Sequence, residues 1–480
     1  MDSIKGKINS GAKWTSISTI VITLLQIGQF IVLGNIMSAK EFGMIGMLTT
    51  ITIFAQIFVE LGLGAAVIQK HHATERQLST LFWINVLLGI FICFLMQAAS
   101  PMIADYFQTK ELEGKVRLLS IVFLIAPIGQ QSQYLMQRDL SFKTLGKIET
   151  ISNVLSFSLL IGLLLFLKQN PVNAYVWSQV CLYSLKGILF YICYSPKWRP
   201  SFVLDIKDCK EFFSFGVYQL LSRLVNRLGS NMDMLLIGRF MGMEALGIYN
   251  LVYQIITIPV LKLNPIITRV AFPVFAKDKN NNRALESGYL YMTKLLAIVS
   301  FPLLLGLYAV ADLVIPLFFG EQWMAAVPVL EIMIIVGILR VLMNPNGSII
   351  LAKGKADIAF YWDLGVLVCY GLALLAAVRS NQLEIVAWTY VGVSILNFIG
   401  GRILLTRMIG LQLKSYVKAL LLPLILAVVS SGIALLLKTQ MTSIHNNLVW
   451  ALVWSVLISG ISYLLLLHAL KHVAFREEYQ

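Results

Sequence analysis

Long apolar runs alternate with short polar segments along almost the whole chain, and many of those segments are basic. A helix that crosses a bilayer needs about 20 mainly apolar residues. Fourteen stretches of the sequence meet this requirement, of which the seventh and tenth are the most polar. The pattern predicts an all-α integral membrane protein with about 14 transmembrane helices. The stretches run roughly over 14–36, 42–68, 79–104, 117–137, 148–167, 172–195, 211–241, 246–272, 288–318, 324–350, 357–378, 383–405, 416–437 and 446–470.

Composition supports the same fold class. Of the 480 residues, 58% are hydrophobic and 13% are charged, whereas a soluble domain is about 45–50% apolar and about 25% charged. Length alone would allow about three soluble domains. A larger core does not explain so large a shift, but an outer surface in contact with lipid does.

The formal net charge of +14 reflects the position of the basic residues. If the N-terminus is cytoplasmic, the cytoplasmic segments hold 24 of the 38 Lys and Arg residues, the outer loops hold 7 and the spans hold 7. Cytoplasmic loops of membrane proteins are enriched in Lys and Arg. The count therefore predicts that both termini are cytoplasmic, and it explains the positive charge without a nucleic-acid partner.

The N-terminus carries Lys5, Lys7 and Lys13 ahead of an apolar stretch at 14–37. The apolar core of a signal peptide has only about 7–15 residues, and no cleavage site of small residues follows this stretch. We therefore expect a retained first transmembrane helix.

Two segments share a pattern at an offset of 204 positions, LGNIMSAKEFGMI at 33–45 and IGRFMGMEALGIY at 237–249. The offset aligns Gly43 with Gly247, and each segment joins the first two spans of a six-span block. Six spans separate the copies, so both have the same membrane orientation. Parallel repeats of this kind are a feature of transporters. We expect two pseudo-symmetric six-helix lobes, at 1–200 and 201–410, followed at 411–480 by two additional helices and a short cytoplasmic tail.

The seventh span carries the densest set of polar residues in the chain. At 100° per residue these residues occupy an arc of about 180°, and the opposite side of the helix is apolar. A charge within a membrane span is costly and usually functional. The polar face must therefore line water, a substrate or another polar helix. Its members are Gln219, Ser222, Arg223, Asn226, Arg227, Ser230, Asn231 and Asp233.

The first span repeats this arc without the charges. Under the same offset, Gln26 and Gln29 align with Ser230 and Asp233. Two polar helices at equivalent positions predict a cavity between the lobes, with positive charge on one wall. A structural ion pair between an arginine of the seventh span and Asp233 is the alternative.

Other charged residues lie within spans, among them Lys186 and Arg239, with carboxylates such as Glu60 and Glu149 available as partners. Charges near the ends of a span can reach the interface without any function. We therefore predict that only some of the polar and charged residues within spans line the cavity. They are Arg223, Arg227, Gln219, Asn226, Asn231, Asp233, Lys262, Lys294, Arg340, Gln26 and Gln29.

Signals of catalysis are missing from the sequence. It contains no GxxxxGK[ST] phosphate loop, DxD, HExxH or GxSxG motif, so we expect neither an enzyme nor direct use of ATP. The five cysteines have no metal-ligand spacing and are typical of packing residues. No cofactor or metal is expected.

The chain resembles the polysaccharide-transport flippases of the multidrug/oligosaccharidyl-lipid/polysaccharide exporter superfamily, and within it the colanic-acid and teichuronic-acid type of exporter. The resemblance covers about two thirds of the chain, in the family's order. It rests on KWTSIS at 13–18, EFGMIGM at 41–47, ELGLGAAVIQ at 60–69, QRDLSFK at 137–143, MDMLLIGRFMGMEALGIYNLVYQI at 232–255 and FGEQW at 319–323.

This resemblance implies two six-helix lobes in a V around a central cavity, located in the bacterial cytoplasmic membrane. It also implies translocation of a lipid-linked saccharide, usually linked to undecaprenyl pyrophosphate, with a polysaccharide polymerase and glycosyltransferases as partners in the same pathway. Asp233 and Gly238 match the family's pattern in the seventh span, and Gly43 and Gly247 match it in the linkers. No set of catalytic residues is carried over.

Two alternatives stay open. A drug or metabolite exporter of the same superfamily would need an acidic and aromatic cavity for cations, against which the arginines of the seventh span argue. A membrane-embedded polysaccharide polymerase or ligase would need a large outer loop, whereas the longest one here, near 105–116, has about a dozen residues.

Overall fold

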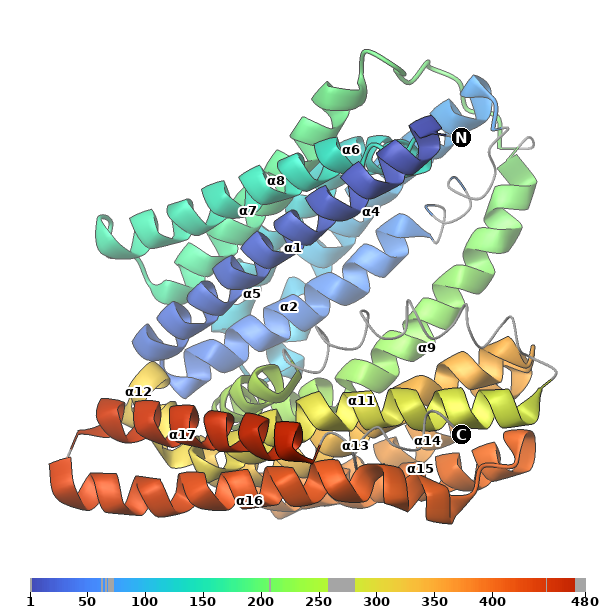
Figure 1. Ribbon diagram of the computed structural model, residues 1–480. Coiled ribbons are helices and arrows are strands. Elements are labelled where there is room, and N and C mark those ends of the chain that lie inside the picture. The colour runs from blue at the N-terminus through green and yellow to red at the C-terminus, as the bar shows by residue number, and fades with distance from the viewer. Residues whose placement is uncertain are drawn as a thin grey trace. The chain divides into compact units, whose positions relative to one another are not determined.

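The computed structural model describes the chain apart from residues 1, 62–63, 65–66, 68–72, 207–208, 258–280, 446 and 471–480, and the described residues form helices and connecting loops without a strand. The chain divides into two compact units, Met1–Gly247 and Ile248–Gln480 (Figure 1). Each unit has its own packed helices and is described by itself.

Unit 1 consists mainly of long helices whose starts are fixed by local sequence. Ser38 and Thr74 each begin a helix with a capping box, in which their hydroxyls accept from the backbone of Glu41 and Gln77, and this arrangement satisfies the free N–H groups of a first turn. The helices are α1 (Asp2–Ile36), α2 (Ala39–Glu60), α4 (Glu75–Tyr106), α5 (Glu111–Ser120), α6 (Val122–Arg138), α7 (Phe142–Leu165), α8 (Pro171–Tyr194) and α9 (Lys210–Phe240).

Glycines allow two close helix contacts in unit 1. A β-carbon on Gly129 of α6 would overlap the backbone of Gly187 in α8. Likewise, Gly43 of α2 and Gly247 have their backbones against each other, so the glycines that the sequence repeat aligns are neighbours in space. Small residues at such crossings let two helix backbones approach closely, which is a common way to pack helices in lipid.

Unit 2 is organised around α11, which packs against α13 and α16. Figure 1 shows α16 and α17 running side by side as a pair of long helices. Following a helical stretch over 242–257 that begins at the end of unit 1, the helices are α11 (Asn282–Ala309), α12 (Ala311–Phe319), α13 (Ala326–Ala352), α14 (Ala356–Ala377), α15 (Leu383–Ile409), α16 (Leu413–His445) and α17 (Leu448–Ala469).

Eleven of the described helices are long and apolar enough to cross a membrane, which confirms the all-α membrane class. They correspond to eleven of the fourteen expected spans. Of the other three, 117–137 falls on the shorter helices α5 and α6, 211–241 falls on the more polar α9, and 246–272 is described only in part. The total of fourteen therefore stays a prediction.

Candidate functional site

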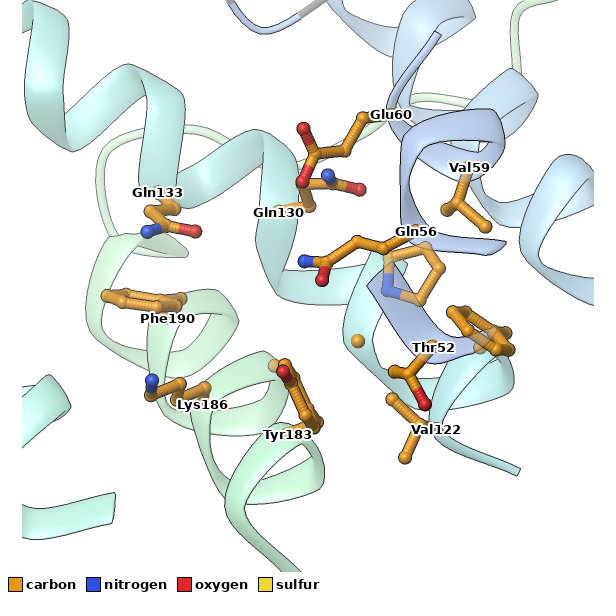
Figure 2. Close-up of a pocket in the computed structure, with 14 residues that line it drawn as sticks. Thr52, Gln56, Val59, Glu60, Val122, Gln130, Gln133, Tyr183, Lys186 and Phe190 are labelled. Atoms are coloured by element: carbon orange, nitrogen blue, oxygen red, sulfur yellow. The ribbon is translucent and has the colours of Figure 1, made fainter. Parts of the chain in front are cut away.

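A cavity of about 150 Å³ with a mixed polar and apolar lining lies in unit 1, among α2, α6 and α8. Figure 2 shows the side chains that surround it. Half of the lining is apolar, with residues such as Val59 and Phe190, and the other half is polar or charged. The polar lining consists of Thr52, Gln56, Glu60, Gln130, Gln133, Tyr183 and Lys186.

Helix periodicity explains why these residues gather. Thr52, Gln56 and Glu60 recur every fourth residue of α2, so they share one face of that helix. Tyr183 and Lys186 of α8 are three residues apart and share a face in the same way. Each helix thus gives the cavity one polar stripe.

Glu60 connects this cavity to the polar face of α9. Its Oε2 lies 2.6 Å from Nη1 of Arg223, and Arg227, one helical turn further, also attracts the carboxylate. Arginine and carboxylate groups form short, strong hydrogen bonds of this kind. Two guanidinium groups thus act on one carboxylate, Arg223 in direct contact and Arg227 over a longer range, which leaves an excess of positive charge beside Glu60.

Lys186 adds a further positive charge on the opposite wall of the cavity. It lies on α8, partly buried, and the carboxylate of Glu149 on α7 is near enough to attract it. On α6, Gln130 donates from Nε2 to the hydroxyl of Tyr134 over 2.9 Å. The cavity therefore offers amides for hydroxyl groups and cations for anionic groups.

The other predicted residues of α9 differ in their exposure to solvent. Asn226 and Arg227 are exposed, whereas Asp233 is 1% exposed. The amide of Asn231 donates to the backbone oxygen of Arg227 over 2.9 Å. Gln219 is half-buried on the same helix.

The predicted residues of α1 lie apart from the cavity. Gln26 is exposed and Gln29 is half-buried on a helix that packs against α7. Among the described residues, those that line the cavity come from α2, α6 and α8.

In unit 2, Arg340 of α13 lies between two tyrosine rings. Its guanidinium carbon is 5.2 Å from the ring centres of both Tyr253 and Tyr390, and it donates hydrogen bonds to both hydroxyls. Tyr249 stacks on Tyr253, and Tyr370 packs against Tyr390. Cation–π contacts and hydrogen bonds with both tyrosines hold the guanidinium in place.

The prediction included two further cationic residues, Lys294 and Lys262. Lys294 lies half-buried on α11 of unit 2. Lys262 lies outside the described residues.

Sequence reasoning did not select the residues that line the unit 1 cavity. Glu60 and Lys186 were recognisable as charges within spans, but only as members of a longer set. Gln130 and Gln133 interrupt an apolar span, and that interruption was an available signal of a polar interior surface.

Comparison with known proteins gives the chain clear relatives. A family model described as "Polysaccharide biosynthesis protein" matches residues 32–328. The chain is 55% identical over 471 residues to the teichuronic acid biosynthesis protein TuaB of Bacillus subtilis (strain 168), covering 97% of this chain and 96% of the relative. It is 31% identical over 446 residues to the lipopolysaccharide biosynthesis protein WzxC of Escherichia coli (strain K12), covering 92% and 90%.

The fold is also shared with a solved structure. The lipid II flippase MurJ, in its inward closed conformation, matches with a TM-score of 0.76 over 97% of this chain and 99% of that chain. Sequence identity is 14%, so this match concerns the fold alone.

Proposed function

We propose that this chain, which belongs to the family of polysaccharide biosynthesis proteins, is a flippase. The protein moves a lipid-linked oligosaccharide repeat unit, of the undecaprenyl-pyrophosphate type, across the bacterial cytoplasmic membrane for assembly of a cell-surface polysaccharide. Its relatives are named for teichuronic acid and lipopolysaccharide biosynthesis, and a flippase for lipid II shares its fold.

The observation that carries the proposal is the excess of positive charge beside Glu60. Arg223 and Arg227 lie one turn apart, and two like charges held that close in a membrane protein are costly unless water or an anion offsets them. A pyrophosphate supplies that anion, and an arginine fork binds it through two parallel hydrogen bonds. The glutamines of the adjacent cavity suit the hydroxyl groups of a saccharide.

The proposed substrate-binding set extends beyond this pair. It keeps the polar residues of α1 and α9, and in unit 2 it relies on Arg340, which two tyrosine rings hold in place. Alternating access exposes these residues to each leaflet in turn. Both termini are cytoplasmic in this proposal, and a polymerase and glycosyltransferases act before and after the flippase.

A drug exporter of the same superfamily is the second candidate, and the same arginines argue against it, because a cationic drug would be repelled. A membrane polymerase or ligase is the third, and the family of the chain argues against that class.

The test is the fate of the lipid-linked saccharide in a deletion strain. Without the protein, the intermediate accumulates with its saccharide facing the cytoplasm, and the surface polysaccharide is lost. Restoring the wild-type gene reverses both changes. A deletion strain with normal surface polysaccharide and no accumulated intermediate, in a background without a second flippase, would refute the proposal.

A further inference from the structure

The segment 201–206, between α8 and α9, is tied to the first turns of α4 by hydrogen bonds. Nε1 of Trp83 donates to the backbone oxygen of Ser201 over 2.9 Å. The backbone N–H of Ser201 donates to Oγ of Ser79 over 3.1 Å, and the two serine hydroxyls lie 3.0 Å apart. The segment is therefore fixed at its first residue.

A second attachment follows two and four residues later. Oγ1 of Thr80 donates to the backbone oxygen of Val203 over 3.3 Å and accepts from the backbone N–H of Asp205 over 3.0 Å. Thr80 is fully buried. Residues 201, 203 and 205 thus bind α4, which leaves the alternate positions to point elsewhere.

Those alternate positions are all large and apolar, and all are exposed. Phe202 is 92% exposed, Leu204 56% and Ile206 60%. The Phe202 ring stacks on Trp83 with 4.9 Å between ring centres. Three large apolar side chains on the outer side of a segment fixed on its inner side form a surface that avoids water.

This surface continues the lipid-facing side of α4. Leu87, Phe91 and Phe94 are exposed apolar residues of that helix, and with Trp83 they recur every three or four residues on one face. Since α4 is long and apolar enough to cross the membrane, this face contacts lipid. Trp83 is the first of these residues along α4, and tryptophan is enriched at membrane–water boundaries.

Positive charge flanks the apolar residues. Lys197 and Arg199 precede the segment, Lys210 follows it, and all three are exposed. Basic residues beside apolar ones are the combination that binds the surface of an anionic bilayer.

We propose that the 201–206 segment is an interfacial membrane anchor. Phe202, Leu204 and Ile206 enter the lipid at the level of the head groups, and the flanking basic residues contact anionic head groups. The occupant of this surface is the bilayer around unit 1, because the surface is continuous with the lipid-facing side of α4. The 201–206 segment is consequently held both by α4 and by the membrane.

The test measures the depth of a spin label in vesicles of phosphatidylethanolamine and phosphatidylglycerol. Cys181, Cys193 and Cys369 are replaced by alanine, and a label is attached at Leu204→Cys or, as the control, at Lys110→Cys, an exposed position outside the proposed anchor. Collision rates with oxygen, which prefers lipid, and with a nickel chelate, which stays in water, report the depth. We expect the label at 204 to be at least severalfold more accessible to oxygen relative to nickel than the label at 110.

Equal nickel accessibility at the two positions would overturn the proposal and would indicate a surface exposed to water and open to a soluble partner. If the Leu204 variant does not fold, Ile206→Cys carries the same expectation. The readout does not require transport, so it stands or fails independently of the flippase function.

Discussion

Arg223 of α9 and Glu60 of α2 form an ion pair with 2.6 Å between Nη1 and Oε2, although 163 positions separate them in the chain. The pair joins the polar face of α9 to the cavity among α2, α6 and α8. Arg227 lies one turn away and attracts the same carboxylate over a longer range. One glutamate thus serves two arginines, and the charge that it does not neutralise is available to an anionic substrate.

Replacing Arg223 or Arg227 by Gln should lower translocation about tenfold or more, since a hydrogen bond to a charged group contributes about 1.5–3 kcal/mol. Arg→Lys should restore only part of the rate, because a point charge replaces the planar fork. Protein abundance and translocation are measured in the same strains, and we expect abundance to change little.

The alternative interpretation is that the Arg223–Glu60 pair has a purely structural role. A substitution at Glu60 distinguishes this role from substrate binding. If Arg223 serves only to neutralise Glu60, Arg223→Gln should lower abundance, and Glu60→Gln in addition should restore both abundance and transport. Substrate binding predicts that the paired change restores abundance at most, while translocation stays low.

The crossing of α6 and α8 supplies a prediction about stability. A β-carbon on Gly129 would overlap the backbone of Gly187, whereas one on Gly162 of α7 would meet nothing within 4 Å. Gly129→Ala should destabilise the protein by about 1–3 kcal/mol, the usual cost of overpacking. Gly162→Ala should be neutral or slightly stabilising, because alanine favours a helix. Thermal unfolding in detergent compares the two, and equal midpoints would contradict the observed crossing.

The contacts of Arg402 of α15 predict a loss of stability when this residue is replaced. It is 4% exposed, its Nη2 donates to Oδ1 of Asn346 over 2.6 Å, and the rings of Phe398 and Tyr416 lie 4.8 and 4.6 Å from its guanidinium carbon. Lysine cannot reproduce these stacked contacts. Arg402→Lys should lower the unfolding midpoint by several degrees, whereas the same change at the exposed Arg379 should leave it unaltered.

Low pH should weaken the ion pair that joins Lys40 of α2 to Glu111 of α5. A hydrogen bond from Lys40, with 2.9 Å between Nζ and Oε1, is the main cause that holds the pKa of Glu111 below its ordinary value. Because the folded pKa is the lower one, the pair stabilises the protein above the ordinary value of about 4.3 and loses this effect as the pH falls through the folded pKa. Both side chains are exposed, so the effect should be below about 1 kcal/mol.

The matching measurement compares the wild type with Glu111→Gln. Their unfolding midpoints should differ slightly at pH 7 and converge as the pH falls through the lowered pKa of Glu111. A difference that persists unchanged in acid would show that the charge of Glu111 is not its cause.

Sequence periodicity was sufficient to predict most of the helices and to assign the chain to the membrane class, because a helix that crosses lipid requires a long apolar run. It was also sufficient to find the polar face of α9, since Arg223, Arg227 and Asn231 recur every four residues. It was not sufficient to pair Arg223 with Glu60. A span shows which of its faces is polar, but the packing of other helices decides which polar group faces it.

The cavity in unit 1 illustrates the same limit. Lys186 and Gln133 are each unremarkable as single polar residues within a span. They become a site only because α6 and α8 cross closely at Gly129 and Gly187, which brings their polar stripes to a common space. A pattern along one helix contains no information about such a crossing.

Transport of the lipid-linked saccharide in purified vesicles tests the central claim most directly. Vesicles with the labelled lipid in both leaflets receive the wild-type protein, the double variant Arg223→Gln, Arg227→Gln, or no protein. An enzyme added outside then reports how much saccharide reaches the outer leaflet without any nucleotide. The flippase account predicts that the wild type makes the inner-leaflet pool accessible and that the double variant does so at a small fraction of that rate. A wild-type rate equal to that of protein-free vesicles, or an undiminished rate in the double variant, would contradict it.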